Sequence, residues 1–339
     1  MPVLLEAENL ARSFTLGRKG LFRPARQFNA VDGVSLSVNR GETLGIVGES
    51  GCGKSTLSRL LLGLLPPSQG SVMLDGAETT DVTPEEWRRL RQRMQLVFQD
   101  AAGSLDPRLT IRAQVEEPLR IHGLPLEMAD TALDAVGLGG AMSARYPHEM
   151  SGGQLQRVII ARALVMKPEF LVLDEPVSAL DVSIQAQIVN LLRDLQRELG
   201  LTYVFVSHDL GIVRHVSDRV AVMYLGRIVE TAPKAEFYAK PLHPYSQLLL
   251  NSVPVPDPTR RKRARIVPGD PPNPADPPSG CRFHPRCPLA TKLCREQAPE
   301  LRDFGGRQAA CHMIETARVA PKRAAVPTPD ARQEEEVFA

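Results

Sequence analysis

The residues best suited to chemistry form a glycine-rich loop. Backbone N–H groups exposed by its glycines can face a β-phosphate, and the N-terminus of a following helix adds positive potential there. Lys54 can reach the β- and γ-phosphates, and the Ser55 hydroxyl can ligate Mg²⁺. The loop therefore predicts a site for a nucleoside triphosphate with Mg²⁺. Its positions fit G-x-x-x-x-G-K-[ST] and, with the residue that follows, are Gly48, Glu49, Ser50, Gly51, Cys52, Gly53, Lys54, Ser55 and Thr56.

The segments on either side of this loop are those that the motif requires. The apolar run 43–47 predicts a strand, and residues 56–62 predict a helix that begins directly after the loop. This context disfavours the alternative of a glycine-rich turn with an incidental lysine. Buried parallel strands are expected at 170–173 and 203–206, and an amphipathic helix at 184–199.

The order of these elements predicts an α/β nucleotide-binding domain over residues 1–250. Within it, residues 100–167 carry helical periodicity without a convincing strand and predict a helical subdomain. Residues 251–278 are rich in proline and arginine and predict an extended linker. A small region with four cysteines is expected at 279–316, followed by a disordered tail at 317–339.

Polar side chains follow three of the expected strands. Asp174 and Glu175 end the run 170–175, and they are suited to hold Mg²⁺ and to polarise an attacking water, respectively. Gln99 follows a further strand and could reach the metal or the water. His208 could bond the γ-phosphate and hold Glu175 in place. Taken singly, these residues could equally be solvated polar groups at strand ends.

A second segment suited to anion binding begins at Ser151. Ser151 is a natural N-cap, and the two glycines that follow it expose N–H groups at the positive end of a helix. The alternative is an ordinary capped helix. A single bound nucleotide does not need a second such site, but a nucleotide shared between two subunits does. The segment comprises Ser151, Gly152, Gly153 and Gln154.

Over residues 3–250 these motifs, in this order, resemble the ATP-binding subunits of ABC transporters, which share a P-loop NTPase core. The resemblance implies a head-to-tail pair of such domains. Each ATP then lies between the phosphate loop of one subunit and Ser151–Gln154, with Asp181, of the other. ATP binding closes the pair, and hydrolysis reopens it and drives a membrane partner through the surface near Gln99. The family stacks adenine on an aromatic residue near the N-terminus, for which Phe14 is the first candidate and Phe28 the second.

Several further segments narrow the resemblance to the oligopeptide/dipeptide-permease ATPases, of the second-ATPase type, with their cysteine-containing C-terminal extension. The resemblance implies a second, different ATPase subunit, two membrane permeases, and an extracytoplasmic binding protein that delivers a peptide cargo. Nickel complexes or glutathione are alternative cargoes, and a soluble ABC-type ATPase that acts on nucleic acid or the ribosome is the alternative function. The segments are 30–34, 97–100, 104–108, 148–154, 182–186, 243–246 and 280–288.

The four C-terminal cysteines, Cys281, Cys287, Cys294 and Cys311, predict a metal site, since a reducing compartment disfavours a disulfide framework. Soft thiolates select Zn²⁺ or an iron–sulfur cluster. The spacings contain no short C-x2–4-C pair of the kind typical of zinc, which favours [4Fe–4S] with Zn²⁺ as the alternative. Free thiols, redox disulfides, or a histidine that replaces one ligand also remain open.

Bulk composition places limits on the class of protein. The chain has 339 residues, of which 43% are hydrophobic and 24% charged, and its net charge is +2. This charge argues against a general affinity for nucleic acid, and none is expected as a partner. No apolar run reaches the roughly 18–20 residues needed to span a bilayer. The acidic N-terminal segment does not resemble a signal peptide. We therefore expect a peripheral protein on the cytoplasmic face of the inner (plasma) membrane.

Overall fold

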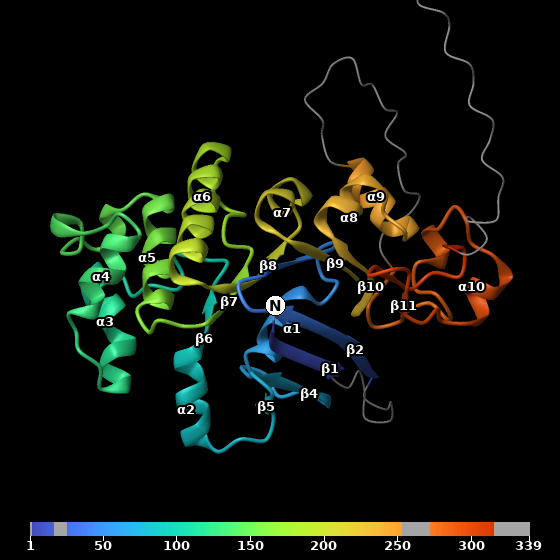
Figure 1. The fold of residues 1–339 in the computed structure, drawn as a ribbon, viewed down its shortest axis with the longest axis horizontal. Coiled ribbons are helices and arrows are strands. Elements are labelled where there is room, and N and C mark those ends of the chain that lie inside the picture. Colours follow the sequence, from blue (N-terminus) through green and yellow to red (C-terminus); the bar gives the residue numbers. More distant parts are fainter. Residues whose placement is uncertain (1, 17–25, 253–271, 315–339) are drawn as a thin grey trace, which may run out of the picture.

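The computed structural model describes residues 2–16, 26–252 and 272–314. Its described part contains a mixed eight-stranded sheet, a four-stranded antiparallel sheet and flanking helices (Figure 1). The eight-stranded sheet has the order β11-β12-β10-β9-β3-β8-β7-β6, and the smaller sheet the order β2-β1-β4-β5. The strands are β1 (Val3–Leu16), β2 (Arg26–Asn39), β3 (Thr43–Val47), β4 (Gln69–Leu74), β5 (Ala77–Glu78), β6 (Met94–Val97), β7 (Phe170–Asp174), β8 (Thr202–Ser207), β9 (Arg219–Tyr224), β10 (Arg227–Pro233), β11 (Arg302–Asp303) and β12 (Gln308–Ala309). The helices are α1 (Lys54–Leu61), α2 (Pro84–Arg93), α3 (Ile111–His122), α4 (Met128–Ala135), α5 (Gly152–Leu164), α6 (Val182–Leu199), α7 (Leu210–Val216), α8 (Lys234–Ala239), α9 (Pro244–Ser252) and α10 (Lys292–Glu296), with short 3-10 turns η1 (Gly140–Met142), η2 (Pro147–Glu149) and η3 (His284–Arg286).

The centre of the larger sheet is parallel, as its continuous apolar strands predict. Strands β6, β7, β8, β3 and β9 pair in parallel, so their carboxyl ends meet at one edge. Successive side chains of a strand enter different cores: Leu171 and Leu173 pack on one face, and Phe170 and Val172 on the other. The strands expected at 43–47, 170–173 and 203–206 are therefore confirmed, and the sheet is buried on both faces.

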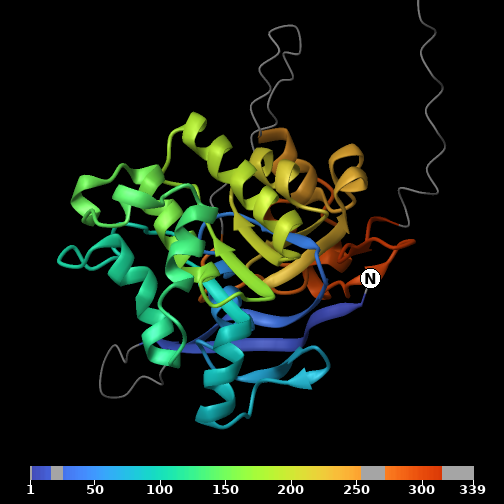
Figure 2. The same ribbon diagram turned by 60° about the vertical axis from the view of Figure 1, so that its left-hand side comes forward.

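Helices and the smaller sheet cover the two faces of the larger sheet. Helix α1 packs through Leu57 and Leu61 into the core shared with the small sheet. Helices α5, α6 and α7 contribute to the core on the opposite face, where the expected helix at 184–199 forms the greater part of α6 (Figure 2). This three-layer arrangement fixes the loop between β3 and α1 at the carboxyl edge of the parallel strands.

The described chain between β6 and β7 is helical. Arg112 of α3 forms an ion pair with Asp130 of α4 at 2.6 Å and so links the two helices. It also pairs with Glu116 of its own helix at 2.7 Å. The cap residue Thr110 accepts from the N–H of Ala113 and begins α3. These helices, with α5, project from one end of the molecule (Figure 1). They carry the Ser151 segment away from the β3–α1 loop within the same chain.

The C-terminal region, residues 272–314, lies at the other end of the larger sheet (Figure 1). Its strand β12 pairs with β10, with Ala309 opposite Glu230, so the region extends the main sheet. It follows α9, which ends at Ser252. Most of the expected linker and the whole tail, with the basic segments of residues 17–25 and 260–265, lie outside the described residues.

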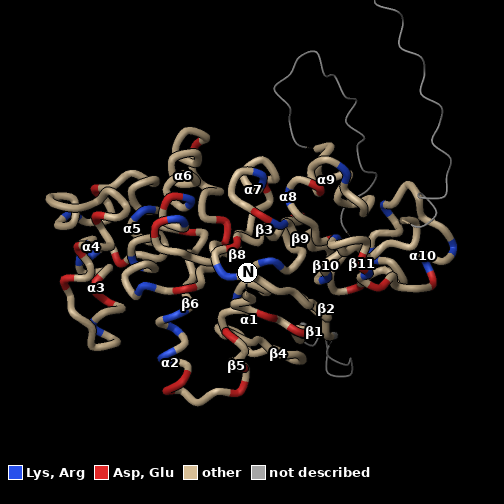
Figure 3. The backbone as a smooth tube through the Cα atoms, in the orientation of Figure 1, with Lys and Arg blue, Asp and Glu red and all other residues tan. Residues whose placement is uncertain are grey.

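Charges of both signs are distributed over the described elements (Figure 3). The helix α2 carries its acids in the first turn and its arginines toward the end, in line with the helix dipole. No helix in the described ranges is long and apolar enough to cross a membrane.

Candidate functional site

The loop Gly48–Ser55, called the phosphate loop below, connects β3 to α1 and is shaped by close backbone contacts. A Cβ at Gly48 would lie 2.2 Å from the Met223 carbonyl oxygen, and one at Gly53 would lie 2.2 Å from that of Ala30. Gly53 also has φ +107°, which side chains rarely adopt. It is the N-cap of α1 and provides no side-chain cap, so the first N–H groups of the helix remain available to phosphate oxygens.

Lys54 and Ser55 lie where phosphate and Mg²⁺ chemistry requires them. The Lys54 side chain is buried, and its Nζ donates to the carbonyl oxygens of Gly48 at 2.8 Å and Glu49 at 3.1 Å. The Ser55 hydroxyl lies 3.2 Å from Oδ1 of Asp174, at the end of β7. Burial raises the pKa of Asp174. A hydroxyl and a carboxylate thus converge beside the loop, and oxygen donors of this kind fit a magnesium ion.

Glu175 is held between the two other strand-end residues. Its Oε2 lies 3.2 Å from Nε2 of Gln99 and 3.2 Å from Nδ1 of His208. Its backbone has φ +49°, and its N–H donates to the Val206 carbonyl, which turns the side chain out at the end of β7. The three residues come from the ends of β7, β6 and β8, so parallel strand order brings them together.

A cavity of 540 Å³ joins these residues to the phosphate loop. Gln99, Glu175 and His208 line it together with Phe14 and Phe28, the two candidates for adenine stacking. The two rings face each other across β1 and β2, with centroids 5.7 Å apart. Sequence reasoning missed other lining residues, because nothing in their local pattern marks them: Asn29, Ala30, Leu225, Gly226 and Pro274.

The described lining of this cavity includes none of Ser151, Gly152, Gly153, Gln154 or Asp181. Ser151 caps α5, and its oxygen accepts from the N–H of Gln154. Ser151 and Gly152 are exposed, and a Cβ at Gly153 would lie 2.5 Å from Ile184, near the start of α6. Asp181 caps α6 by accepting from the N–H of Ile184 at 3.0 Å. The segment Ser151–Gln154, for which anion binding is predicted, thus begins with exposed residues that do not line this cavity.

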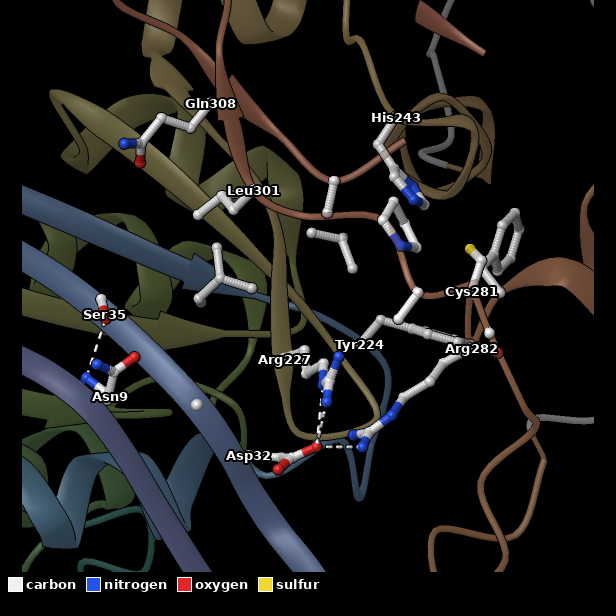
Figure 4. A pocket seen from close by; sticks show the side chains of 18 residues that line it. Asn9, Asp32, Ser35, Tyr224, Arg227, His243, Cys281, Arg282, Leu301 and Gln308 are labelled. Atoms are coloured by element: carbon white, nitrogen blue, oxygen red, sulfur yellow. Dashed lines mark hydrogen bonds and ion pairs between the residues drawn. The ribbon is translucent and has the colours of Figure 1, made fainter. Parts of the chain in front are cut away.

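The C-terminal region also contacts the phosphate loop, and the sequence did not indicate this. Arg286 forms two bonds of 2.8 Å with the carboxylate of Glu49. A second cavity, of 480 Å³, is lined in part by Cys281 and Arg282 of the same region (Figure 4). There Asp32 faces both Arg227 and Arg282. Burial acts to raise the pKa of Asp32, but the two guanidinium groups outweigh it and lower the pKa.

The four C-terminal cysteines lie in one small region and are all free. The Cys281 thiol interacts electrostatically with those of Cys287, Cys294 and Cys311. Burial raises the pKa of the Cys281 thiol to about 11 and also raises the pKa of Cys287 and Cys311, while the nearby backbone groups of Phe283, Leu289 and Met313 act to lower these pKa values. Within the described ranges, however, no three His, Cys, Asp or Glu side chains stand close enough together to hold a metal ion. The expectation of a metal or iron–sulfur centre is therefore not confirmed.

A phosphate loop followed by a β-strand carboxylate pair, on a mixed α/β core, defines a P-loop ATPase. Comparisons with known proteins specify it further. Residues 31–178 match the family model for ABC transporters, and residues 229–294 match that for the C-terminal region of oligopeptide/dipeptide transporters. The second match includes three of the four cysteines.

Close relatives extend over almost the whole chain. It is 50% identical over 323 residues to the oligopeptide transport ATP-binding protein AppF of Bacillus subtilis, which covers 91% of this chain and 97% of that protein. It is 48% identical over 309 residues to the oligopeptide transport ATP-binding protein OppF of Salmonella typhimurium, covering 88% and 92%. The chain belongs to the oligopeptide/dipeptide family of ABC-transporter ATP-binding proteins.

Solved structures agree with this fold. The dimeric, post-hydrolysis ATP-binding cassette MJ0796 bound to ADP and Pi matches with a TM-score of 0.60 and 30% identity, over 68% of this chain and 99% of that one. The structure of cbiO1 from Clostridium perfringens matches with a TM-score of 0.61 and 32% identity, over 71% and 92%. The predictions of an ABC ATPase, of its α/β fold and of its enzymatic class are confirmed.

Proposed function

We propose that this chain hydrolyses ATP at a site shared with a second ATPase subunit and thereby powers the import of peptides. The observation that carries the proposal is the position of Glu175, which lies 3.2 Å from both Gln99 and His208 beside the phosphate loop. A carboxylate held in this way can accept a proton from a water that attacks the γ-phosphate.

The chain's own residues divide the work as follows. The phosphate loop N–H groups and Lys54 bind the β- and γ-phosphates, and Phe14 or Phe28 stacks on adenine. Ser55 and Asp174, with Gln99, hold Mg²⁺, which when bound neutralises charge on the transferred phosphoryl group. Glu175 takes the proton from water, while His208 positions that carboxylate and can bond the γ-phosphate.

The second subunit is required because five of the residues expected to contact nucleotide do not line the cavity. Ser151–Gln154 lies at the exposed start of α5, and Asp181 lies at the start of α6. In a head-to-tail pair, these residues reach the ATP bound by the partner. We propose that the partner is a different ATPase of the same family, so the working pair is a heterodimer.

The membrane partners are proposed to dock beside Gln99, at the cytoplasmic face of the inner (plasma) membrane. Phe98, the residue before Gln99, is 44% exposed, and Leu109, two residues before α3, is 43% exposed. Exposed apolar side chains next to a catalytic strand end suit contact with a permease. Closure of the ATPase pair would then move this surface together with Gln99.

Peptide as cargo is supported by the relatives, whose names are those of oligopeptide transport proteins. An extracytoplasmic binding protein is proposed to deliver it. Nickel, glutathione or another small cargo is the alternative. The ATPase residues described above contact nucleotide rather than cargo, so they do not discriminate among these.

The experiment is a tagged pull-down of the full chain from detergent-solubilised membranes, with partners identified by mass spectrometry. We expect two multi-span permeases and a second ATPase. A Glu175→Gln variant with ATP, which should hold the pair closed, is expected to retain the second ATPase better than the wild-type chain. Recovery of ribosomes or nucleic acid instead of permeases would contradict the proposal and favour the soluble-ATPase alternative.

We further propose that Cys281, Cys287, Cys294 and Cys311 bind a [4Fe–4S] cluster, with Zn²⁺ as the alternative occupant. Four thiols in one small region of the chain suit ligation of a single cluster. Binding would deprotonate them against the burial that raises the pKa of Cys281, Cys287 and Cys311. Binding would include a rotation of the side chains, since no three ligands are gathered in the described arrangement. When bound, the cluster would supply structural cross-links. Iron, zinc and acid-labile sulfide analysis after anaerobic purification tests this, and absence of all three would refute it.

A further inference from the structure

We propose that Arg286, in the C-terminal region, is a positioning residue for ATP binding, acting on the phosphate loop through Glu49. The two residues are 237 positions apart in sequence, and the contact joins the cysteine-containing extension directly to the nucleotide site. The proposal concerns ATP affinity alone. It depends neither on the cargo and partners proposed above nor on whether the cysteines hold a metal.

The ion pair has the geometry of a specific contact. Arg286 is the last residue of η3, between Cys281 and Cys287, and is 7% exposed. Its Nη1 lies 2.8 Å from Oε2 of Glu49, and its Nη2 lies 2.8 Å from Oε1. Such a two-pronged pair fixes the orientation of both side chains. The pair raises the pKa of Arg286, so this guanidinium is charged at any working pH.

Glu49 is the point at which three contacts of the phosphate loop meet. Its side chain holds Arg286, and its N–H donates to the hydroxyl of Tyr245 in α9 at 2.9 Å. Its carbonyl oxygen accepts from Nζ of Lys54 at 3.1 Å. Tyr245 is fully buried and packs against Phe283, with ring centroids 5.4 Å apart. A shift of Glu49 is therefore passed to Lys54, the residue expected to hold the β- and γ-phosphates.

The charge of Glu49 gives Arg286 a second effect. A carboxylate inside a loop that receives a polyphosphate repels the ligand unless a cation neutralises it. Arg286 is that cation, and its burial limits screening by solvent. Loss of Arg286 would leave the negative charge of Glu49 uncompensated within the phosphate loop. The effect should fall on ATP affinity rather than on the chemical step, because Gln99, Glu175 and His208 contact neither residue in the described hydrogen bonds and ion pairs.

The segment 281–287, which contains Arg286, also contacts residues next to the phosphate loop through Arg282. Arg282 bonds Asp32 and the carbonyl oxygen of Leu225 (Figure 4). The next residue, Gly226, donates its N–H to the carbonyl of Cys52 in the phosphate loop at 2.8 Å. The segment 281–287 thus supports the loop from two sides, and only the Arg286 contact is direct.

The test measures the affinity of the purified full chain for a fluorescent ATP analogue with Mg²⁺. KM and kcat of ATP hydrolysis are measured separately, on the chain assembled with its partner subunits. The variants are Arg286→Ala, Glu49→Gln and the double variant. The matched control is Arg307→Ala, because Arg307 is also a largely buried arginine of the C-terminal region. It pairs with Glu230 and Glu236, and neither of these contacts the phosphate loop directly. In the described hydrogen bonds Glu230 reaches the loop through His243 and Tyr245.

We expect Arg286→Ala to weaken analogue binding and raise KM roughly tenfold, a typical coupling between linked sites, with kcat at saturating ATP nearly unchanged. Adding Glu49→Gln should recover much of this loss, since it removes the uncompensated charge, and the double-mutant cycle should show strong coupling. Arg307→Ala should lower thermal stability without weakening binding. If Arg286→Ala does not fold, Arg286→Gln with and without Glu49→Gln provides the same comparison, because glutamine also removes the positive charge.

Two results would overturn the proposal. One is analogue affinity equal to that of wild type in a folded Arg286→Ala or Arg286→Gln chain. The other is an equal loss of affinity in Arg307→Ala, which would show that general loosening of the C-terminal region, rather than the Glu49 contact, affects the site.

Discussion

Glu175→Gln is the substitution that tests the proposed chemistry most sharply. The side chain is 16% exposed and touches Gln99 and His208 through one oxygen, Oε2, at 3.2 Å in each case. Glutamine keeps the size of the side chain and adds no strain at φ +49°, because its Cβ is the same. What it loses is the carboxylate that accepts the proton. Removing a positioned general base lowers kcat by ~10²–10⁴-fold, which corresponds to about 3–5 kcal/mol at 1.36 kcal/mol per tenfold change.

The assay is phosphate release at saturating Mg²⁺ and ATP by the chain assembled with its partner subunits. Binding of an ATP analogue should stay close to wild type, because Glu175 makes no described contact with Lys54 or the phosphate loop. The matched control is Glu169→Gln, at the opposite end of β7, where the carboxylate pairs with Arg40 and Arg93 at 2.7 Å. That variant should hydrolyse ATP at nearly the wild-type rate. Hydrolysis by Glu175→Gln within tenfold of wild type would refute the assigned role.

Three further predictions follow from the same structure. Ser151→Arg should abolish hydrolysis by the pair while leaving analogue binding by the single chain intact; a variant that binds no analogue would contradict the placement of Ser151 across the dimer. Phe14→Ala should weaken analogue binding by ~1–3 kcal/mol, the usual worth of one stacked base, and a larger loss in Phe28→Ala would reverse the assignment. Burial lowers the pKa of His243 to about 3, next to the buried Glu230. The neutral, buried His243 contributes fully to the free energy of unfolding above the unfolded pKa near 6.5. Below that pH the unfolded chain binds a proton that the folded chain does not, so the contribution falls by about 1.4 kcal/mol per pH unit toward pH 3. Urea unfolding should therefore show that the free energy of unfolding falls more between pH 7 and pH 5 in wild type than in His243→Gln. Equal decreases would refute the role assigned to His243.

The part of the site that lies on consecutive residues could be predicted from the sequence. The phosphate loop needs a strand before it and a helix after it, and both are visible as local apolar patterns at 43–47 and 56–62. Gln99, Glu175 and His208 each follow an apolar run, and parallel pairing places the ends of such runs together. For these residues, the apolar run identifies the strand, and the parallel order of the strands then places the polar residue that follows each of them at the same edge of the sheet.

Contacts between distant segments could not be predicted in this way. No local pattern pairs Arg286 with Glu49, because an ion pair across 237 positions is set by the fold of everything between. Strands β11 and β12 have two residues each, which is too short for an alternation to be seen. The long β1 and β2 contain several register shifts that break the period of two, so an alternating pattern does not run along the full length of either strand.

For the cysteines, the sequence predicts the type of ligand but not the positions of the side chains. Their residue type and clustering predict a thiolate site, and the structure does gather Cys281, Cys287, Cys294 and Cys311 in one region. Spacing alone does not determine side-chain rotation, and the described thiols are not arranged around a common point. Whether the four cysteines bind a metal is therefore decided by metal analysis, because neither their spacing nor their backbone positions determine it.

The central claim is that ATP hydrolysis at this site drives peptide import, and uptake coupled to hydrolysis tests it directly. The complex isolated with the tagged chain is reconstituted in vesicles with its binding protein, and labelled peptide uptake is measured beside phosphate release. The account predicts that peptide stimulates phosphate release, that uptake requires ATP, and that Glu175→Gln abolishes both. Phosphate release that no peptide stimulates, without peptide uptake, would contradict it.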